Sequence, residues 1–267
     1  MSGDVVPELI KNDNRVETCG AICDSIENRI DPLLVKVFID FDGTITLKDV
    51  GANIFIEFGE KEKAYEIIYG FRDGIYTATE TWDELLKTLI VTNEEKIKEY
   101  TSSFEMDEHF PEFISFLRQQ RIEHYIVSDG FRFYIESILE REGLRVPFFA
   151  NDLVFGEGEV KMDFPYTDEH CIKCANCKRN HVVSLSADHE FSIYIGNGNS
   201  DICAALHCDY IFAKDSLLKY CELNRVSYYP FKDFRDVQIR ISELLGKKRL
   251  KKRHQAELNR RKLYMQG

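Results

Sequence analysis

Five short stretches of the chain are predominantly apolar and are bounded by polar or glycine-rich segments. They lie at residues 33–39, 122–127, 191–195, 210–213 and 226–229. Runs of this kind are typical of strands that are buried on both faces of a parallel sheet. Because segments with helical spacing separate them, the pattern predicts an α/β fold whose core is a doubly wound, Rossmann-like parallel sheet.

The segments between these strands supply the predicted helices of the core. Residues 109–120, 133–141 and 201–206 have apolar side chains at helical spacing, which we expect to face the sheet. Residues 154–164 contain Gly156 and Gly158 and predict a hairpin beside the core.

The segment between the first two predicted strands is too long for a simple crossover. Its apolar residues recur at helical spacing, so we expect a small helical cap domain at residues 49–107, inserted into a core of residues 34–48 and 108–246. A cap would exclude water and admit only a substrate that fits beneath it. The helices that we expect in it are 50–58, 61–69, 81–90 and 94–100.

Two carboxylates follow the first predicted strand directly. Asp40 and Asp42 stand in the segment DFDGTIT, which begins a tight turn at Gly43. Parallel sheets bind ligands beyond the carboxyl ends of their strands, so both side chains are expected where chemistry takes place. Two acids beside a glycine are also an ordinary turn. The motif therefore needs partners at other strand ends.

Such partners follow the other predicted strands. Ser128, Asp129 and Gly130 offer a hydroxyl and backbone amides that suit a phosphate oxygen. Lys178 is a candidate fixed cation, and residues 196–201 (GNGNSD) form a glycine-rich turn with oxygen ligands suited to Mg²⁺.

In this order, the four elements resemble the motifs of the haloacid dehalogenase-like phosphatases, and the resemblance spans residues 34–240. Within that superfamily the chain is most similar to the branch that holds phosphoserine phosphatase, the phosphoethanolamine/phosphocholine phosphatases and the methionine-salvage phosphatase of 2-hydroxy-3-keto-5-methylthiopentenyl-1-phosphate. The last is the most similar in its secondary motifs, at 71–74, 128–134 and 228–234. The resemblance implies a Mg²⁺-dependent phosphatase of a small phosphorylated metabolite.

Phosphoryl transfer requires a nucleophile in line with the leaving group, a cation and positioned donors. Asp40 is placed to attack phosphorus and form an aspartyl phosphate, and Asp42 to protonate the leaving oxygen and then activate water. The expected substrate-binding residues are Thr44, Ser128, Asp129, Gly130, Lys178 and Arg72, and the expected metal ligands are Asp40, Asp42, Asn197 and Asp201.

One position departs from the family pattern. An aspartate usually follows the glycine of the last motif as a metal ligand, whereas this chain has Asn197 there. An asparagine oxygen can bind Mg²⁺ but removes one negative charge, so weaker metal binding is expected. Two alternatives remain open: a binding or regulatory protein with impaired catalysis, and a phosphotransferase that uses the same nucleophile.

Three of the eight cysteines cluster before the candidate lysine. Cys171, Cys174 and Cys177 have ligand types and spacing that zinc accepts. A structural Zn²⁺, a disulfide within this loop and reduced thiols are all compatible with the sequence, as is a loop that only delivers Lys178 to the phosphate.

Composition and charge indicate the expected compartment and partners of the chain. No stretch is apolar enough to span a bilayer, and the first residues lack a secretory pattern, so we expect the cytoplasm. Residues 1–33 form an N-terminal extension. Residues 247–267 form a basic tail with nine Lys or Arg against one acid, in a chain of net charge −11. The tail leaves nucleic acid open as a less expected partner, with packing on the acidic body or on another subunit as alternatives. The oligomeric state is not predicted.

Overall fold

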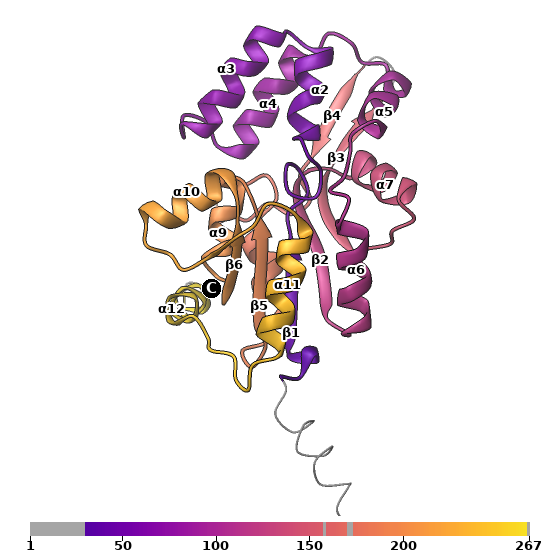
Figure 1. Ribbon diagram of the computed structural model, residues 1–267. Helices are drawn as coiled ribbons and strands as arrows, with labels where there is room; N and C mark the ends of the chain where they lie inside the picture. Colours follow the sequence, from indigo (N-terminus) through magenta and orange to yellow (C-terminus); the bar gives the residue numbers. More distant parts are fainter. Residues whose placement is uncertain (1–29, 157–158, 170–172, 266–267) are drawn as a thin grey trace, which may run out of the picture.

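The computed structural model describes residues 30–156, 159–169 and 173–265. In this part of the chain the strands form one seven-stranded sheet in the order β4-β3-β2-β1-β5-β6-β7 (Figure 1). All neighbouring strands are parallel except β3 and β4, which form the predicted hairpin. The strands are β1 (Val35–Ile39), β2 (Glu123–Phe131), β3 (Phe148–Phe155), β4 (Val160–Asp163), β5 (Phe191–Gly196), β6 (Tyr210–Ala213) and β7 (Tyr229–Pro230).

Helices cover both faces of this sheet, as the pattern predicted. On one face, α6 (Phe110–Gln119) and α11 (Phe234–Leu245) meet through the rings of Phe110 and Phe234, whose centroids are 4.8 Å apart. On the other face, Phe38 of β1 belongs to a second apolar cluster. The helices of that face are α8 (Lys178–Leu185), α9 (Ile202–Ala205) and α10 (Asp215–Leu223), while α7 (Arg132–Arg141) packs on β3. The doubly wound fold is confirmed.

The long insertion between β1 and β2 folds as a helical layer. It lies beyond the carboxyl ends of the central strands (Figure 1) and packs on the core partly through Trp82, whose ring centroid is 4.9 Å from that of Phe131. Its two connections to the core run side by side, with the Leu47 amide 3.0 Å from the Glu105 carbonyl. The helices of this layer are α2 (Val50–Phe58), α3 (Lys61–Arg72), α4 (Ala78–Thr88) and α5 (Glu94–Ser102).

Most predicted elements agree with the structure, with three differences in where an element ends or how long it is. Strand β2 continues to Phe131. The expected phosphate-binding motif at residues 128–130 therefore lies within the strand instead of after it. Strand β7 is only two residues long. Helix α3 extends three residues beyond the predicted end and so places Arg72 in its last turn.

The basic tail contains helix α12 (His254–Tyr264), which lies against the core. Arg260 is 8% exposed and lies 3.2 Å from the Asp209 carboxylate, while Arg253 donates to the Cys208 and Ala205 carbonyls at 2.9 and 2.7 Å. The tail therefore packs on the body of the same chain, which was one of the alternatives left open by the sequence. Residues 1–29 of the predicted extension lie outside the described residues. Among the described helices, none is long and apolar enough to cross a membrane.

Candidate active site

Strand β1 ends in a buried ion-pair cluster. The Asp40 side chain is 5% exposed, and the Lys178 Nζ lies 2.5 Å from its Oδ1. The same nitrogen lies 2.7 Å from Oδ1 of Asp201, which is fully buried. Lys178 is the first residue of helix α8, and its side chain lies between the two carboxylates. One lysine therefore faces two acids, and the cluster has a net negative charge only when both are ionised.

Asp201 accepts hydrogen bonds on both oxygens of its carboxylate. In addition to Lys178, its carboxylate accepts from the Tyr194 hydroxyl at 2.7 Å and from the backbone amides of Asn197 and Gly198 at 2.9 and 2.8 Å. With four donors and no exposed surface, both oxygens of Asp201 are fully hydrogen-bonded. In this arrangement Asp201 holds Lys178 and the turn that follows β5, and its role as a metal ligand stays a prediction.

Thr44 links Asp40 to Asn197. The threonine hydroxyl lies 2.9 Å from Oδ2 of Asp40 and 3.2 Å from Oδ1 of Asn197. Gly43 allows this approach, because it has a φ of +74° and a Cβ at its position would lie 2.5 Å from the Asn197 side chain. Asn197 is thus next to Asp40, as the motif predicted, with an amide in place of a carboxylate.

Asp42 is the second carboxylate of the site and also has four donors. Its Oδ1 accepts from the amides of Val50 and Gly51 at 2.9 and 3.3 Å, at the start of the helical insertion. Its Oδ2 accepts from the Tyr134 hydroxyl at 2.7 Å and lies 3.2 Å from the Ser128 hydroxyl. These donors leave the carboxylate little capacity for a metal, so a contribution of Asp42 to a metal site would have to come from its backbone carbonyl.

Gly130 leaves the space in which the Tyr134 hydroxyl meets the Asp42 carboxylate. A Cβ on Gly130 would lie 1.7 Å from the Tyr134 hydroxyl and 2.4 Å from Oδ2 of Asp42. Any larger residue there would push the two groups apart. The glycine of the SDG motif therefore allows the tyrosine to reach the carboxylate, which the sequence pattern alone did not indicate.

Behind the SDG motif, Asn176 holds the strand in place. Its side-chain nitrogen donates to the Ser128 carbonyl at 2.7 Å, and its backbone amide donates to the Asp129 carboxylate at 2.8 Å. Its side-chain oxygen lies 2.7 Å from Nε2 of His181, which stacks on Phe149 at a centroid distance of 4.2 Å. Burial lowers the pKa of His181 to about 4, so this histidine is neutral at neutral pH and donates from Nε2.

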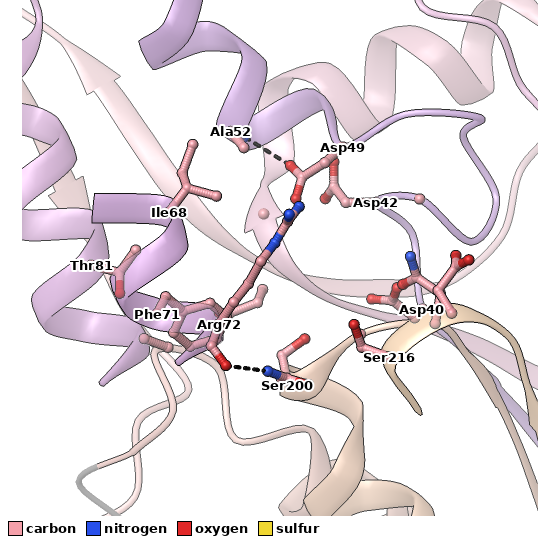
Figure 2. Close-up of a pocket in the computed structure, with 18 of the residues that line it drawn as sticks. Asp40, Asp42, Asp49, Ala52, Ile68, Phe71, Arg72, Thr81, Ser200 and Ser216 are labelled. Carbon is pink, nitrogen blue, oxygen red and sulfur yellow. Dashed lines mark hydrogen bonds between the residues drawn. The ribbon is translucent and has the colours of Figure 1, made fainter. Parts of the chain in front are cut away.

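The site opens into a cavity of about 590 Å³ between the core and the insertion. In Figure 2, Arg72 extends from α3 across the cavity toward Asp49 and Asp42, with Asp40 on the opposite side. Ser128 is fully buried and does not line the cavity, whereas Asp129 and Gly130 do. Leu47 of the core lines the cavity, and the rest of the apolar wall comes from the insertion and consists of Ala52, Ile68, Phe71, Ala78, Trp82 and Leu85.

Burial shifts the acid–base properties of three carboxyl groups. Burial, aided by the charge of Asp201 and opposed by Lys178, raises the pKa of Asp40 to about 7. Burial and the charge of Asp49 raise the pKa of Asp42 to about 7, and burial raises the pKa of Asp129 to about 6. Burial acts to lower the pKa of Lys178, but the charges of Asp201 and Asp40 outweigh it and raise the pKa. The lysine therefore stays charged.

The residues around Asp40 fit a magnesium ion that takes part of its coordination from a substrate. Mg²⁺ in phosphoryl-transfer sites is held by one or two carboxylates together with phosphate oxygens and water. Asp40 and Asn197 both line the cavity and supply one carboxylate and one amide oxygen. Within the described ranges, no three Asp, Glu, His or Cys side chains converge as a metal site. The protein alone thus offers few charged ligands.

The cysteine loop gives no support to the zinc alternative. Cys171 lies outside the described residues, Cys174 is half-buried and Cys177 is buried. The Cys177 amide donates to the Tyr166 carbonyl at 2.8 Å, directly before the helix that Lys178 begins. No metal-binding group for zinc forms in the part of the chain that the structure describes. The loop positions the lysine.

Sequence reasoning identified the residues that bear charge and missed those that orient them. The structure brings Asp40, Asp42, Lys178 and Asn197 to one end of a cavity and places Arg72 across it. The missed residues are Tyr134, Asn176 and His181.

Comparison with known proteins finds relatives that are named phosphatases. The model of the family described as "Putative Phosphatase" matches residues 35–219. A Bacillus cereus protein (strain ATCC 14579) named 2-hydroxy-3-keto-5-methylthiopentenyl-1-phosphate phosphatase is 33% identical over 215 residues, which cover 79% of this chain and 97% of that protein. A protein of the same name from Bacillus thuringiensis subsp. konkukian (strain 97-27) has the same identity and coverage.

Solved structures show the same fold at lower sequence identity. A substrate-bound phosphoserine phosphatase complex has a TM-score of 0.63 and 19% identity, and covers 77% of this chain and 97% of its own. A phosphoserine phosphohydrolase-like protein from Francisella tularensis subsp. tularensis SCHU S4 has a TM-score of 0.61 and 18% identity, with 77% of this chain and 99% of that chain covered.

Proposed function

Because this chain belongs to the phosphatase family described as "Putative Phosphatase", within the haloacid dehalogenase-like phosphatases, we propose that it hydrolyses a small phosphomonoester through a phosphorylated Asp40. One observation supports this most strongly. A buried carboxylate, held by a buried lysine, faces a cavity that also contains a second carboxylate with a pKa raised to about 7.

In the first step, an oxygen of ionised Asp40 attacks phosphorus, and the bond to the leaving oxygen breaks. Lys178 stabilises the negative charge on the equatorial phosphate oxygens, because it is charged and fixed by Asp201. The backbone amide of Asp129 is a candidate donor to the same oxygens. The Gly130 amide donates to the Ser128 hydroxyl at 2.9 Å, and we expect that hydroxyl to turn from Asp42 to the phosphate when substrate binds.

Asp42 serves both proton transfers. With a pKa of about 7, a fraction of it is protonated at neutral pH and can donate to the leaving alkoxide. The ionised Asp42 then accepts a proton from the water that attacks the phosphorylated Asp40. The Tyr134 hydroxyl and the amides of Val50 and Gly51 hold its oxygens in place during both steps.

Magnesium, when bound, would screen the repulsion between Asp40 and the phosphate dianion. Asp40 and Asn197 would hold it, with the Asp42 carbonyl as a further candidate. Because Asn197 contributes no charge, we expect a higher magnesium requirement than a second carboxylate would give.

The insertion acts as the cap that selects the substrate. We propose residues 49–107 as this cap domain, in agreement with the paired connections at Leu47 and Glu105. Its apolar wall favours a substrate with an apolar part, such as the 2-hydroxy-3-keto-5-methylthiopentenyl-1-phosphate in the names of its relatives. Arg72 would contact a polar group in the middle of that substrate.

The test is phosphate release from a panel of phosphomonoesters that includes this compound and phosphoserine, with and without Mg²⁺. We expect metal-dependent release from the wild type, highest for the methylthiopentenyl compound, and none from Asp40→Asn. Equal release by Asp40→Asn and the wild type would overturn the proposal.

A further inference from the structure

Lys214 follows strand β6 directly and lies behind the candidate active site. Its Nζ lies 3.4 Å from the Thr44 carbonyl oxygen and 5.2 Å from the centroid of the Phe231 ring. The lysine is half-buried and is not one of the residues that line the active-site cavity. We therefore expect no contact between Lys214 and a substrate, so any effect on the reaction has to pass through the residues that it touches.

Thr44 is the contact that connects Lys214 to the chemistry. Thr44 is 1% exposed, and its hydroxyl lies 2.9 Å from Asp40 and 3.2 Å from Asn197. Within the described part of the chain, Lys214 is the donor that reaches its carbonyl oxygen. A buried carbonyl that loses its donor costs free energy and can move to find another. Lys214 therefore fixes the residue that joins Asp40 to Asn197.

The segment that begins with Lys214 also holds the backbone of Asn197. The Lys214 amide donates to the Gly196 carbonyl at 3.2 Å, and the Leu217 amide donates to the Asn197 carbonyl at 2.9 Å. The start of α10 thus contacts both candidate metal ligands, Asn197 through backbone bonds and Asp40 through Lys214 and Thr44. A change of the Lys214 side chain leaves the backbone bonds in place and acts only on the Thr44 side.

Lys214 also adds a positive charge near the phosphate end of the cavity. Burial lowers the pKa of Lys214 from its ordinary value, while the charges of Asp215, Asp107, Asp40 and Asp233 oppose this effect. The lysine can therefore act in two ways, by holding Thr44 or by its charge alone. These two ways predict opposite changes in the binding of a cation such as Mg²⁺.

We propose that Lys214 is a positioning residue, which holds Thr44 and thereby keeps Asp40 and Asn197 in the arrangement that binds Mg²⁺. The inference rests on the proposed phosphatase function and adds to it a residue that the sequence motifs do not include. Partners that orient metal ligands commonly contribute about tenfold to a hundredfold in metal affinity or activity.

Two substitutions of Lys214 test this proposal. Lys214→Met removes the charge and the donor but keeps an apolar contact with Phe231, because methionine packs well against aromatic rings. Lys214→Arg keeps both the charge and a donor. Lys214→Met is expected to lower kcat about tenfold, the effect of one hydrogen bond from a charged group, and to leave KM for the ester nearly unchanged. Lys214→Arg should restore most of the lost kcat.

Binding of Mg²⁺, measured by calorimetry in the absence of substrate, gives a readout that does not need turnover. If Lys214 positions the ligands, the Kd for Mg²⁺ should rise about tenfold in Lys214→Met and stay near the wild-type value in Lys214→Arg. If the lysine acted only by its charge, its removal would make Mg²⁺ bind more tightly. Lys232→Met is the matched control, because Lys232 is exposed, adjoins Phe231 and does not line the cavity.

The outcomes separate the role of Lys214 from the phosphatase function. Wild-type kcat and Mg²⁺ affinity in Lys214→Met would overturn the positioning role and leave the phosphatase intact. Weaker Mg²⁺ binding in Lys214→Met that Lys214→Arg restores, in a protein that hydrolyses no ester, would support the role and count against the phosphatase. Tighter Mg²⁺ binding in Lys214→Met, equal losses in Lys232→Met, or no Mg²⁺ binding by the wild type would each contradict the proposal. Thermal melting checks the fold, and a loss of kcat that accompanies a lower Tm and persists in Lys214→Arg would reduce Lys214 to a structural role.

Discussion

The two ends of the active-site cavity are built in different ways. At the phosphate end, Asp40, Lys178 and Asp201 have 5%, 2% and 0% of their side chains exposed, and each is held by several hydrogen bonds. At the end formed by the insertion, Arg72 and Asp49 are exposed. The first end is rigid because each polar group there has a fixed partner.

This contrast separates chemistry from specificity. A buried and fully bonded cluster keeps its geometry whichever substrate enters, which preorganised electrostatics requires. Exposed side chains on an inserted layer can change without loss of the core. Substitutions should therefore have large effects at the phosphate end and smaller ones elsewhere, as the following predictions specify in order of size.

Lys178→Met should have the largest effect. It leaves Asp40 and Asp201 buried without their shared cation, so we expect unfolding in urea to show a loss of about 3–5 kcal/mol, together with a loss of about a thousandfold in turnover. Lys219→Met, at an exposed lysine of the same cavity, should retain wild-type stability. Equal stability of the two variants would contradict a cluster that depends on Lys178.

Asp42→Asn should lower turnover by about a hundredfold or more for alkyl phosphates and change the pH profile. Attack requires ionised Asp40, so kcat/KM falls as pH drops below about 7; donation requires protonated Asp42, so kcat/KM also falls as pH rises above about 7. The variant should lose only the alkaline limb. With p-nitrophenyl phosphate, whose leaving group needs no proton, its defect should be much smaller, and an equal defect with both ester types would remove Asp42 as the acid.

Asn176→Ala tests whether the strand behind the site needs its support. The change removes the bonds to the Ser128 carbonyl and His181, so we expect a cost of about 2–3 kcal/mol in stability and about tenfold in kcat. Asn224→Ala, at an exposed asparagine that bonds only its own helix, is the matched control. A loss of stability without any loss of kcat would limit Asn176 to a structural role.

Asn197→Asp should strengthen Mg²⁺ binding, because it adds the negative charge that the amide of Asn197 lacks. We expect the Mg²⁺ concentration for half-maximal phosphate release to fall about tenfold. Asn199→Asp, two residues on, serves as the comparison and should change the requirement less. An unchanged requirement in Asn197→Asp would place Asn197 outside the metal site.

Arg260→Ala should leave kcat/KM unchanged and still destabilise the protein, because it lies far from the cavity in the fold and is buried against Asp209. Loss of its bonds to Asp209 and the His207 carbonyl should cost about 2–3 kcal/mol in thermal or urea unfolding. Arg261→Ala, at the exposed neighbouring arginine, should cost nothing measurable. A fall in kcat/KM for Arg260→Ala would connect the tail to the site.

The sequence was most informative about features that depend on residues close together along the chain. The strand predicted at 33–39 is present at 35–39, because residues 32–34 form a short 3-10 helix instead. The helix at 50–58 follows from periodicity and agrees with the structure, and the acids at 40 and 42 follow the strand as expected. Asp201 was assigned to the metal because its spacing from Gly196 is compatible with either role. Only the fold shows that Tyr194 and Lys178 occupy its oxygens.

The contacts that escaped prediction join distant parts of the chain. Tyr134 reaches Asp42 across 92 positions, and Asn176 reaches Ser128 across 48. Such pairs depend on how α7 and the cysteine loop pack, which no local pattern encodes.

The central claim is that Asp40 becomes phosphorylated during turnover. The most direct measurement is mass spectrometry of peptides from enzyme that was quenched in acid during turnover of its best substrate. We predict the mass of one added phosphoryl group on the peptide that contains Asp40 in the wild type, more of it in Asp42→Asn, where water attack is slowed, and none in Asp40→Asn. Rapid phosphate release with no phosphorylated peptide from the wild type or from Asp42→Asn would contradict the account.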